Sequence, residues 1–249
     1  MISIKPVLTQ MDKIKKVREI IFRKKLLRIW YEYIYAKAKR IAQETPGNGI
    51  LIELGAGASF IHSFIPEIIT SDTIPNDHID LIVDATKMPY QESSVRFIFM
   101  MNVLHHISEV ELFFNEVNRC LNRGGKLLIV DQYPGIFSYW VYKFLHHEHF
   151  NEKSKHWSFP SSGPGSVENG ALAYMVFYRD VDQFQSSFPN LRIEKKTIHT
   201  PFTYWLSGGL RSWCLIPGFL ARPVFWVDQM FCKWFPQCGS FVDIEIRKI

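Results

Sequence analysis

The chain has 249 residues, of which 47% are hydrophobic and 21% charged, a composition that indicates a globular protein of one large domain or two small ones. Its four cysteines form no CxxC pair and no ligand spacing with histidine, so we expect reduced cytosolic thiols rather than a metal motif. The net charge of +5 is concentrated in residues 1–45, which hold twelve Lys/Arg against four Asp/Glu. Without an RNA- or DNA-binding motif, this charge does not predict a nucleic-acid partner.

Residues 11–44 are expected to form one long helix or two in succession. Apolar side chains recur at helical spacing in two rows on opposite sides. The first row consists of Ile14, Val17, Ile20, Ile21, Leu27, Tyr31, Ile34, Ala38 and Ile41, and the second of Phe22, Leu26, Ile29 and Tyr33. A helix that is apolar on two faces is covered on both, or lies against lipid or a hydrophobic substrate. We favour packing between the core and a C-terminal segment, with residues 1–45 as a helical cap on a domain of residues 46–249.

A short apolar run, Ile50–Ile52, is followed by an acid and two glycines, Glu53-Leu54-Gly55-Ala56-Gly57. The run is typical of a buried parallel strand. Glycine lacks the Cβ that forbids positive φ and close approach of a ligand, so this turn suits a binding loop. Residues 60–65 are expected to open a helix whose first amides point back at the turn. Strand, glycine turn and helix together are typical of the nucleotide-binding start of a doubly wound α/β domain.

Four further strands are predicted before residue 131, at residues 67–71, 79–83, 95–101 and 126–130. Asp72 follows the first of these, 19 residues after Glu53, close to the spacing at which a nucleotide fold places a carboxylate against ribose hydroxyls. Between the last two strands we expect a helix capped by Ser108. It should run to Leu121 and end at a glycine C-terminus, Asn122-Arg123-Gly124-Gly125.

Residues 48–133 resemble the core of a class I S-adenosylmethionine-dependent methyltransferase, similar to the type 11 group. The matching pieces occur in the family's order and at its spacing. They are Glu53-Leu54-Gly55-Ala56-Gly57, Asp72, Asp84-Ala85 before a Met-Pro, Asn102 with Leu104-His105-His106, and Leu121-Asn122-Arg123-Gly124-Gly125-Lys126. The resemblance implies an α/β, Rossmann-like sheet of seven strands in the order 3-2-1-4-5-7-6, with helices on both faces.

The resemblance also implies S-adenosylmethionine as cofactor and a role for each matched residue. The turn formed by Glu53, Gly55, Ala56 and Gly57 would approach the methionine portion, and Asp72 would hold the ribose. Asp84 and Ala85 would meet the adenine, and Asn102 would border the methyl group.

Two departures from the family pattern stand out. Ser59 replaces the usual third glycine, which should narrow the turn without closing it. The segment 73–78 is too short for the helix that normally joins strands two and three, so the sheet near the adenine should be less covered.

A dinucleotide-binding fold is the nearest alternative for this turn. It requires G-x-G-x-x-G and a helix after the second strand, and this chain offers neither. The Gly-Gly-Lys sequence before the fifth strand also favours a methyltransferase.

Beyond Asp131, residues 178–188 are expected to form a helix, and residues 191–200 and 240–249 strands six and seven, the last antiparallel and inserted beside the fifth. Between these strands, residues 201–239 form an apolar, aromatic insertion. Its large aromatic residues include Trp205, Trp213, Phe219, Phe225, Trp226, Phe231, Trp234 and Phe235. Charged residues interrupt it, so no uncharged run approaches the ~20 residues of a spanning helix. The insertion is expected to be a lid, a hydrophobic substrate surface, or both.

Several histidines are candidates for the base that an oxygen acceptor needs: His105, His106, His146, His147 and His149. The spacing of the last three matches no known zinc motif, so we expect no metal. We therefore expect methyl transfer to a small-molecule acceptor, through a hydroxyl of a hydrophobic, lipid-linked or saccharide compound. The alternative is a non-catalytic binding module that kept the cofactor fold and acts at a membrane or a protein partner.

The expected location is the cytoplasm, because the first residues carry no long apolar run of a signal peptide. Peripheral contact with the inner membrane face is a further expectation, since the basic N-terminal segment would be drawn to anionic lipid. The sequence leaves the oligomeric state open.

Overall fold

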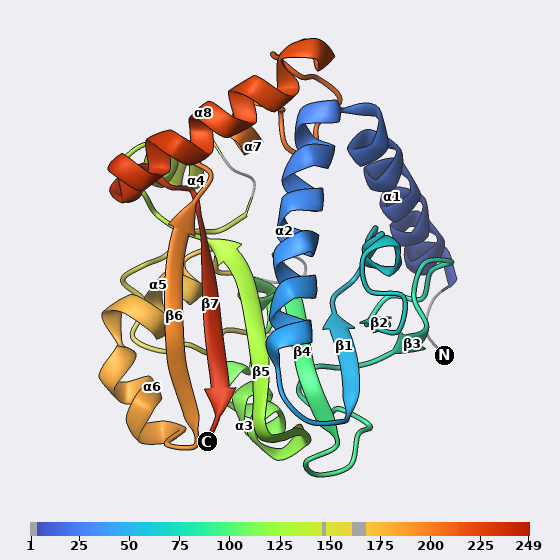
Figure 1. The fold of residues 1–249 in the computed structure, drawn as a ribbon, viewed down its shortest axis with the longest axis vertical. Helices are drawn as coiled ribbons and strands as arrows, with labels where there is room; N and C mark the ends of the chain where they lie inside the picture. The colour runs from blue at the N-terminus through green and yellow to red at the C-terminus, as the bar shows by residue number, and fades with distance from the viewer. Residues whose placement is uncertain (1–3, 146–147, 161–167) are drawn as a thin grey trace.

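The computed structural model describes residues 4–145, 148–160 and 168–249. A seven-stranded sheet in the order β3-β2-β1-β4-β5-β7-β6 forms its centre (Figure 1). The strands are β1 Ile50–Leu54, β2 Ile69–Asp72, β3 Leu81–Ile82, β4 Val95–Met101, β5 Leu121–Gln132, β6 Leu191–His199 and β7 Phe241–Lys248. The first five pair in parallel, and β7 is antiparallel to both β5 and β6. This confirms the predicted Rossmann-like fold and the inserted last strand.

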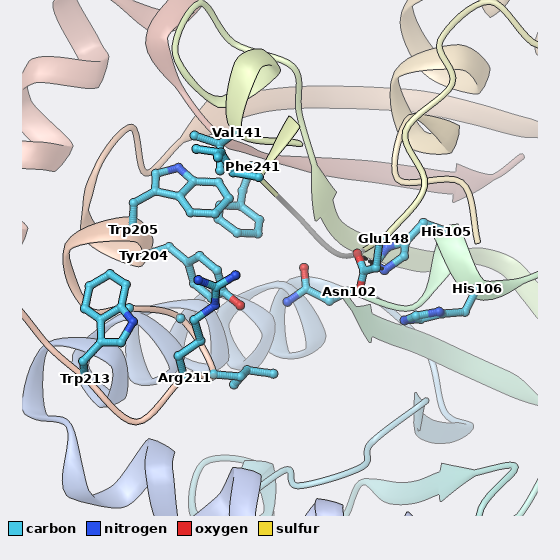
Figure 2. Close-up of a pocket in the computed structure, with 14 residues that line it drawn as sticks. Asn102, His105, His106, Val141, Glu148, Tyr204, Trp205, Arg211, Trp213 and Phe241 are labelled. Carbon is cyan, nitrogen blue, oxygen red and sulfur yellow. Dashed lines mark ion pairs between the residues drawn. The ribbon is translucent and has the colours of Figure 1, made fainter. Parts of the chain in front are cut away.

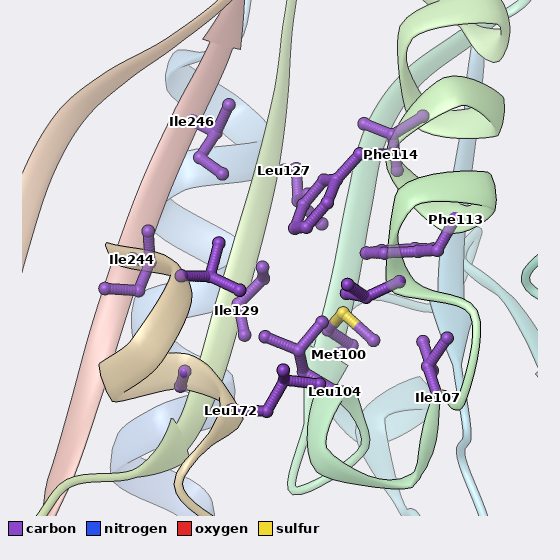
Figure 3. Close-up of a cluster of buried hydrophobic side chains, with 14 of the residues drawn as sticks. Met100, Leu104, Ile107, Phe113, Phe114, Leu127, Ile129, Leu172, Ile244 and Ile246 are labelled. Carbon is purple, nitrogen blue, oxygen red and sulfur yellow. The ribbon is translucent and has the colours of Figure 1, made fainter. Parts of the chain in front are cut away.

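The parallel strands β1, β4 and β5 are almost completely buried, because helices cover both of their faces. On one face lie α3 (Val110–Cys120), α5 (Leu172–Tyr174), a π-helical turn (Met175–Arg179) and α6 (Val181–Ser187). Figure 3 shows Phe113 and Phe114 of α3 packed toward Met100 of β4 and Ile129 of β5. This core holds the carboxyl ends of β4 and β5 in fixed positions, and these ends carry the candidate site.

The other face is covered by the two N-terminal helices, α1 (Ile4–Arg23) and α2 (Lys25–Glu44), as the double apolar pattern predicts. Helix α2 buries Trp30, Ile34 and Tyr35 in the same cluster as Phe97 and Phe99 of β4. The helices expected to form a cap therefore contribute to the core of the sheet itself.

The prediction of a helix starting in residues 60–65 is wrong, since the structure has only one 3₁₀ turn there, Ile61–Ser63. Helix α2 already occupies the place beside β1 that such a helix would take. The ring of Phe60 instead packs edge-on against Tyr35 of α2, with centroids 4.9 Å apart. Pro66, three residues after the end of this turn, opposes its extension as a helix.

The break between α1 and α2 falls at Lys24, whose side chain ties the N-terminal helices to the insertion. Its ammonium group donates hydrogen bonds to the carbonyls of Ser207 (2.6 Å), Gly209, Arg211 (3.0 Å) and Trp213 (3.3 Å). Burial lowers the pKa of Lys24 to about 8. The predicted packing of the N-terminal helices against residues 201–239 is thus confirmed at this junction.

The insertion contains α7 (Thr203–Leu206), a 3₁₀ turn (Gly218–Leu220), α8 (Ala221–Trp234) and a second 3₁₀ turn (Pro236–Cys238). Together with α4 (Ser138–Phe144), it covers the end of the sheet where β1, β4 and β5 terminate, which is the upper end in Figure 1. Among the described residues, no helix combines the length and apolar character needed to cross a bilayer.

Three local predictions about helix ends are wrong. Helix α3 begins at Val110 after Glu109 and has no side-chain cap. Ile107 closes the preceding 3₁₀ turn, Leu104–His106, and the carbonyl of Ser108 accepts a hydrogen bond from Phe159 N (3.1 Å). The glycine pair after α3 lies within β5 rather than capping the helix, because Leu121 is already extended.

The third wrong prediction is the single helix at residues 178–188. The described segment splits there into the π-helical turn, which ends at Arg179, and the short helix α6. Strand β3 is also shorter than predicted, only Leu81–Ile82, and it lies exposed at the sheet edge.

Candidate active site

The glycine turn after β1 has the backbone geometry that its sequence predicts. Gly55 and Gly57 have φ angles of +69° and +48°, in the left-handed region. A Cβ on Gly55 would lie 2.3 Å from a methyl group of Val103, so only glycine fits there. The amide of Gly57 donates to Asp72 Oδ2 at 2.8 Å, which joins the turn to the end of β2.

Glu53 is buried at the base of this turn. Ser59 Oγ donates to Glu53 Oε1 at 3.0 Å and lies 2.9 Å from the hydroxyl of Tyr35 in α2. Glu53 Oε2 has no hydrogen-bond partner among the described residues. Burial is the main cause that raises the pKa of Glu53 to about 8. Ser59, at the position of the third glycine in the family pattern, thus holds the Glu53 carboxylate through its hydroxyl group.

Helix α1 also holds the turn. The guanidinium of Arg18 donates to the carbonyl of Ala58 at 3.1 Å and to that of Ser59. Both N-terminal helices therefore hold the far end of the turn, Tyr35 through the Ser59 hydroxyl and Arg18 through the carbonyls of Ala58 and Ser59.

Asn102 follows β4 in the left-handed conformation, with φ of +55°, and its amide donates to Val130 O at 2.8 Å. Its side-chain Oδ1 is buried without a hydrogen-bond partner among the described residues. Asp84 follows β3, is exposed, and accepts hydrogen bonds from Thr86 N (2.8 Å) and Oγ1 (2.7 Å). Ala85 packs against the core beside it.

The sequence-predicted cofactor residues thus gather where β1, β2 and β4 end, with Asp84 and Ala85 beyond β3. Their donor set fits S-adenosylmethionine, because buried carboxylate and amide oxygens without partners suit a cation, and a carboxylate suits a ribose diol. Glu53, Gly55, Ala56, Gly57, Asp72, Asp84, Ala85 and Asn102 would hold it.

We predict that Asp72→Ala weakens S-adenosylmethionine binding by about 1–3 kcal/mol, the usual cost of losing a charged hydrogen-bond partner. The loss includes the contact of Asp72 with the Gly57 amide, so the turn should also become less ordered. Calorimetric titration of the cofactor measures this effect, with Asp77→Ala as the matched control on the following exposed loop. Unchanged affinity in a folded Asp72→Ala protein would place the ribose contact elsewhere.

A cavity of about 510 Å³ lies beside Asn102, between the end of the sheet and the insertion (Figure 2). Its lining divides into an apolar wall and a polar end. The wall is formed by Val141, Leu145, Tyr204, Trp205, Leu210, Trp213 and Phe241, with Gly208 and Gly209, and Arg211 adds one cationic side chain beside Tyr204 (Figure 2). The polar end is formed by Asn102, His105, His106 and Glu148.

His105 is buried at the polar end between two carboxylates. Its Nδ1 lies 2.6 Å from Asp131 Oδ1, and its Nε2 lies 3.4 Å from Glu148 Oε2. Burial alone would lower the pKa of His105, but the two carboxylates outweigh it and raise the pKa to about 10. Gln132 Nε2 donates to the same Glu148 oxygen at 2.6 Å. At neutral pH the His105 ring is therefore the imidazolium cation, with both nitrogens protonated.

The other predicted histidines lie in different surroundings. His106 is half-exposed, with Nδ1 3.5 Å from Glu168 Oε1. His149 is exposed, and His146 and His147 lie outside the described residues. His105, His106 and Glu148 offer ligand atoms within 4.8 Å of one another. Because both nitrogens of His105 face carboxylates, we interpret this group as an ion-pair network, and the absence of a metal stays a prediction.

Three residues of this site were not among the sequence candidates: Asp131, Gln132 and Glu148. Asp131 had a signal, because it ends the fifth predicted strand at the same sheet edge as Asn102. Glu148 stands between the candidate histidines His147 and His149 in the sequence, but only the fold brings it beside His105.

Three of the tryptophans in the insertion have different environments. Trp205 is half-buried in the pocket wall, and its Nε1 donates to Ser240 Oγ at 2.8 Å. Trp213 lies at the pocket and is 44% exposed, whereas Trp226 projects from α8 and lines no part of this pocket.

Residues 67–129 match the methyltransferase-domain family. No curated protein matches the chain. Among solved structures, an S-adenosylmethionine-dependent methyltransferase from Mesorhizobium loti is 14% identical, with 85% of this chain and 96% of that chain covered and a TM-score of 0.47. A geranyl diphosphate C-methyltransferase from Streptomyces coelicolor, solved with Mg²⁺, geranyl diphosphate and S-adenosylhomocysteine, is 10% identical, with 85% and 78% covered and a TM-score of 0.45. The [4+2]-cyclase SpnF is 14% identical, with 86% and 80% covered and a TM-score of 0.47.

Proposed function

Because this chain is a class I S-adenosylmethionine-dependent methyltransferase, we propose that it methylates a hydroxyl group of an amphipathic small molecule held in the pocket beside Asn102. The observation that carries this proposal is the division of the pocket. An apolar wall of aromatic and aliphatic side chains faces a polar end that contains two histidines and a carboxylate (Figure 2). Such a pocket suits a ligand with a sizeable apolar part and one polar reacting group.

S-adenosylmethionine, when bound, supplies a methyl group on a positively charged sulfur. The chain's own contribution is then mainly positioning. Asn102 stands at the boundary between the cofactor residues and the pocket, so it can orient the reacting groups toward each other. The apolar wall excludes water from the acceptor, because Trp205 and Phe241 close it on the side of the insertion.

We assign the removal of the hydroxyl proton to Glu148. The two carboxylates keep both ring nitrogens of His105 protonated at neutral pH, Asp131 at Nδ1 and Glu148 at Nε2, so His105 acts as a positioning residue rather than a base. Glu148 lines the pocket, where its Oε2 accepts a hydrogen bond from Gln132 Nε2 (2.6 Å) and lies 3.4 Å from His105 Nε2, so these two side chains hold the carboxylate at the polar end (Figure 2). His106 lines the pocket as well and is the remaining candidate from the sequence.

We propose a hydrophobic, lipid-linked compound as the acceptor, with a saccharide hydroxyl as the group methylated. The apolar side chains of the wall support the hydrophobic part, and the polar end beside Asn102 supports the reacting hydroxyl. The proposed location is the cytoplasm at the inner membrane face, which the four free cysteines support.

The proposal is tested with the purified full chain, labelled S-adenosylmethionine and a panel of acceptors that differ only in their apolar part. We expect turnover with lipid-linked hydroxyl compounds and a much higher KM for the matched water-soluble ones. Cofactor binding without turnover on any acceptor would instead favour the non-catalytic binding module, which no specific feature of the site supports.

A further inference from the structure

A large apolar surface remains exposed around the mouth of the pocket. Helix α8 lies across the upper end of the molecule in Figure 1, with α4 close beneath it. The most exposed aromatic side chains are Phe219 and Trp234, at 79% and 78%. The other exposed large apolar residues of this surface are Ile136, Phe137, Trp140, Phe144, Leu145, Trp213, Leu215, Leu220, Trp226, Val227, Met230 and Phe235. We call this set the apolar face.

Helix α8 is apolar on both sides. Its buried side chains, among them Ala221, Phe225 and Cys232, pack inward. Trp226, Met230 and Trp234 follow one another at intervals of four residues and therefore line the opposite, outward side. A surface helix of a soluble protein normally places polar residues there, so this side is built for an apolar environment.

Ring contacts make the apolar face continuous between α4 and α8. Phe137 lies 5.5 Å from Phe202, measured between ring centroids, and Phe202 lies 5.5 Å from Phe231. Phe231 in turn lies 4.9 Å from Phe235 at the end of α8. An apolar groove between α7 and α8 runs through the same region.

The exposed charges on this face have one sign. Within residues 201–239 the only acid is Asp228, which is buried and accepts hydrogen bonds from the amides of Phe202 (2.8 Å) and Thr203 (3.2 Å). The exposed charged side chains of the insertion are Arg211, Arg222 and Lys233.

The junction of α1 and α2 adds further cations. Arg23 donates to Ser212 O at 3.2 Å, and Lys25 lies beside Gly218, so both flank the loop that carries Leu215 and Phe219. Exposed Trp, Phe and Leu side chains surrounded by Lys and Arg are the composition of surfaces that enter the interfacial region of an anionic bilayer.

We propose that the apolar face is a membrane-docking surface, which inserts the aromatic side chains of α4, the 213–220 loop and α8 into the headgroup region of an anionic lipid bilayer. The basic residues at its edge bind lipid phosphates. Leu145 and Trp213 belong both to this face and to the pocket lining, so in the docked protein the mouth of the pocket faces the bilayer. An apolar acceptor then enters from the lipid without crossing water, a consequence that rests on the proposed function.

The test is vesicle co-sedimentation of the full chain with phosphatidylcholine vesicles, with and without phosphatidylglycerol. Trp226→Ser/Trp234→Ser should lose binding by about tenfold or more, because two interfacial aromatic anchors are removed. The matched control is Leu112→Ser/Ile249→Ser, which removes two exposed apolar side chains from α3 and the C-terminus at the opposite end of the molecule. Arg222→Glu/Lys233→Glu should lose the preference for phosphatidylglycerol, whereas Arg192→Glu/Lys195→Glu on β6 should keep it.

Circular dichroism and calorimetric cofactor binding verify that each variant is folded. Absence of wild-type binding to both vesicle types overturns the proposal, as does an equal loss in the control variants. A dimer that Trp226→Ser/Trp234→Ser abolishes, without vesicle binding, assigns the face to a second copy and also overturns it. Vesicle binding without any methyl transfer would leave this surface standing and defeat only the proposed function.

Discussion

Glu148→Gln should lower kcat by about 10²–10⁴-fold, the usual contribution of a positioned general base, while cofactor binding stays intact. The amide is nearly the same shape and can still accept the hydrogen bond from Gln132, but it cannot take a proton. The loss should shrink for acceptors with more acidic hydroxyl groups, because these need less help to lose their proton. Steady-state kinetics across such a series, together with the pH dependence of kcat, measures the effect.

The control for this variant is Glu152→Gln. Glu152 is a nearby carboxylate that accepts a hydrogen bond from Tyr139 (3.0 Å), pairs with Lys143 and does not line the pocket. It should retain normal kcat. If His106→Gln loses the activity and Glu148→Gln does not, the proton acceptor is His106 and our assignment is wrong.

The sequence predicted the sheet well because its strands are specified locally. Uninterrupted apolar runs such as Phe97–Met101 can only be buried between two layers of helices, and the glycine turn at Gly55 has one sterically allowed residue. The failures occur where packing between distant segments decides. Residues 60–65 form only one 3₁₀ turn because α2, some thirty residues earlier in the chain, covers that side of β1.

The site divides in the same way. Glu53, Asp72 and Asn102 lie at the carboxyl ends of neighbouring parallel strands, so their common position at one sheet edge could be predicted from strand order. The pocket could not, because its wall comes from α4, the 208–213 loop and β7, which meet only through tertiary packing. Nor does spacing reveal that His105 lies between Asp131 and Glu148. Asp131 is 26 positions after His105, and Glu148 belongs to an irregular segment after α4.

The ion pair between His105 and Asp131 gives the second large expected effect. Asp131 is fully buried and accepts hydrogen bonds from His105 Nδ1 (2.6 Å) and from the Gln132 amide (2.7 Å). Asp131→Asn keeps the shape and the two hydrogen bonds to Oδ1, but it loses the one that Oδ2 accepts from the His105 backbone amide (3.4 Å) and removes the charge that holds the histidine proton. Removing one partner of a buried pair typically costs about 3–5 kcal/mol of unfolding free energy. Because burial then dominates, the pKa of His105 should fall in this variant.

The pH dependence gives this prediction a definite sign. In the parent chain the pKa of His105 is about 10 when folded against an ordinary value of 6.5, so its stabilisation is complete below pH 6.5 and is lost as the pH rises through 10. The stability difference between the parent and Asp131→Asn should therefore be largest below pH 6.5 and shrink toward pH 10. The pKa of Glu53 is about 8 in the folded chain against an ordinary value of 4.5, so Glu53 also lowers the stability as the pH rises from 4.5 to 8. This contribution is the same in both proteins and cancels in their stability difference. Urea unfolding across this range measures the difference. A difference that stays constant with pH, or a His105 ring that titrates near 6.5 in the parent by NMR, would show that Asp131 does not hold the proton.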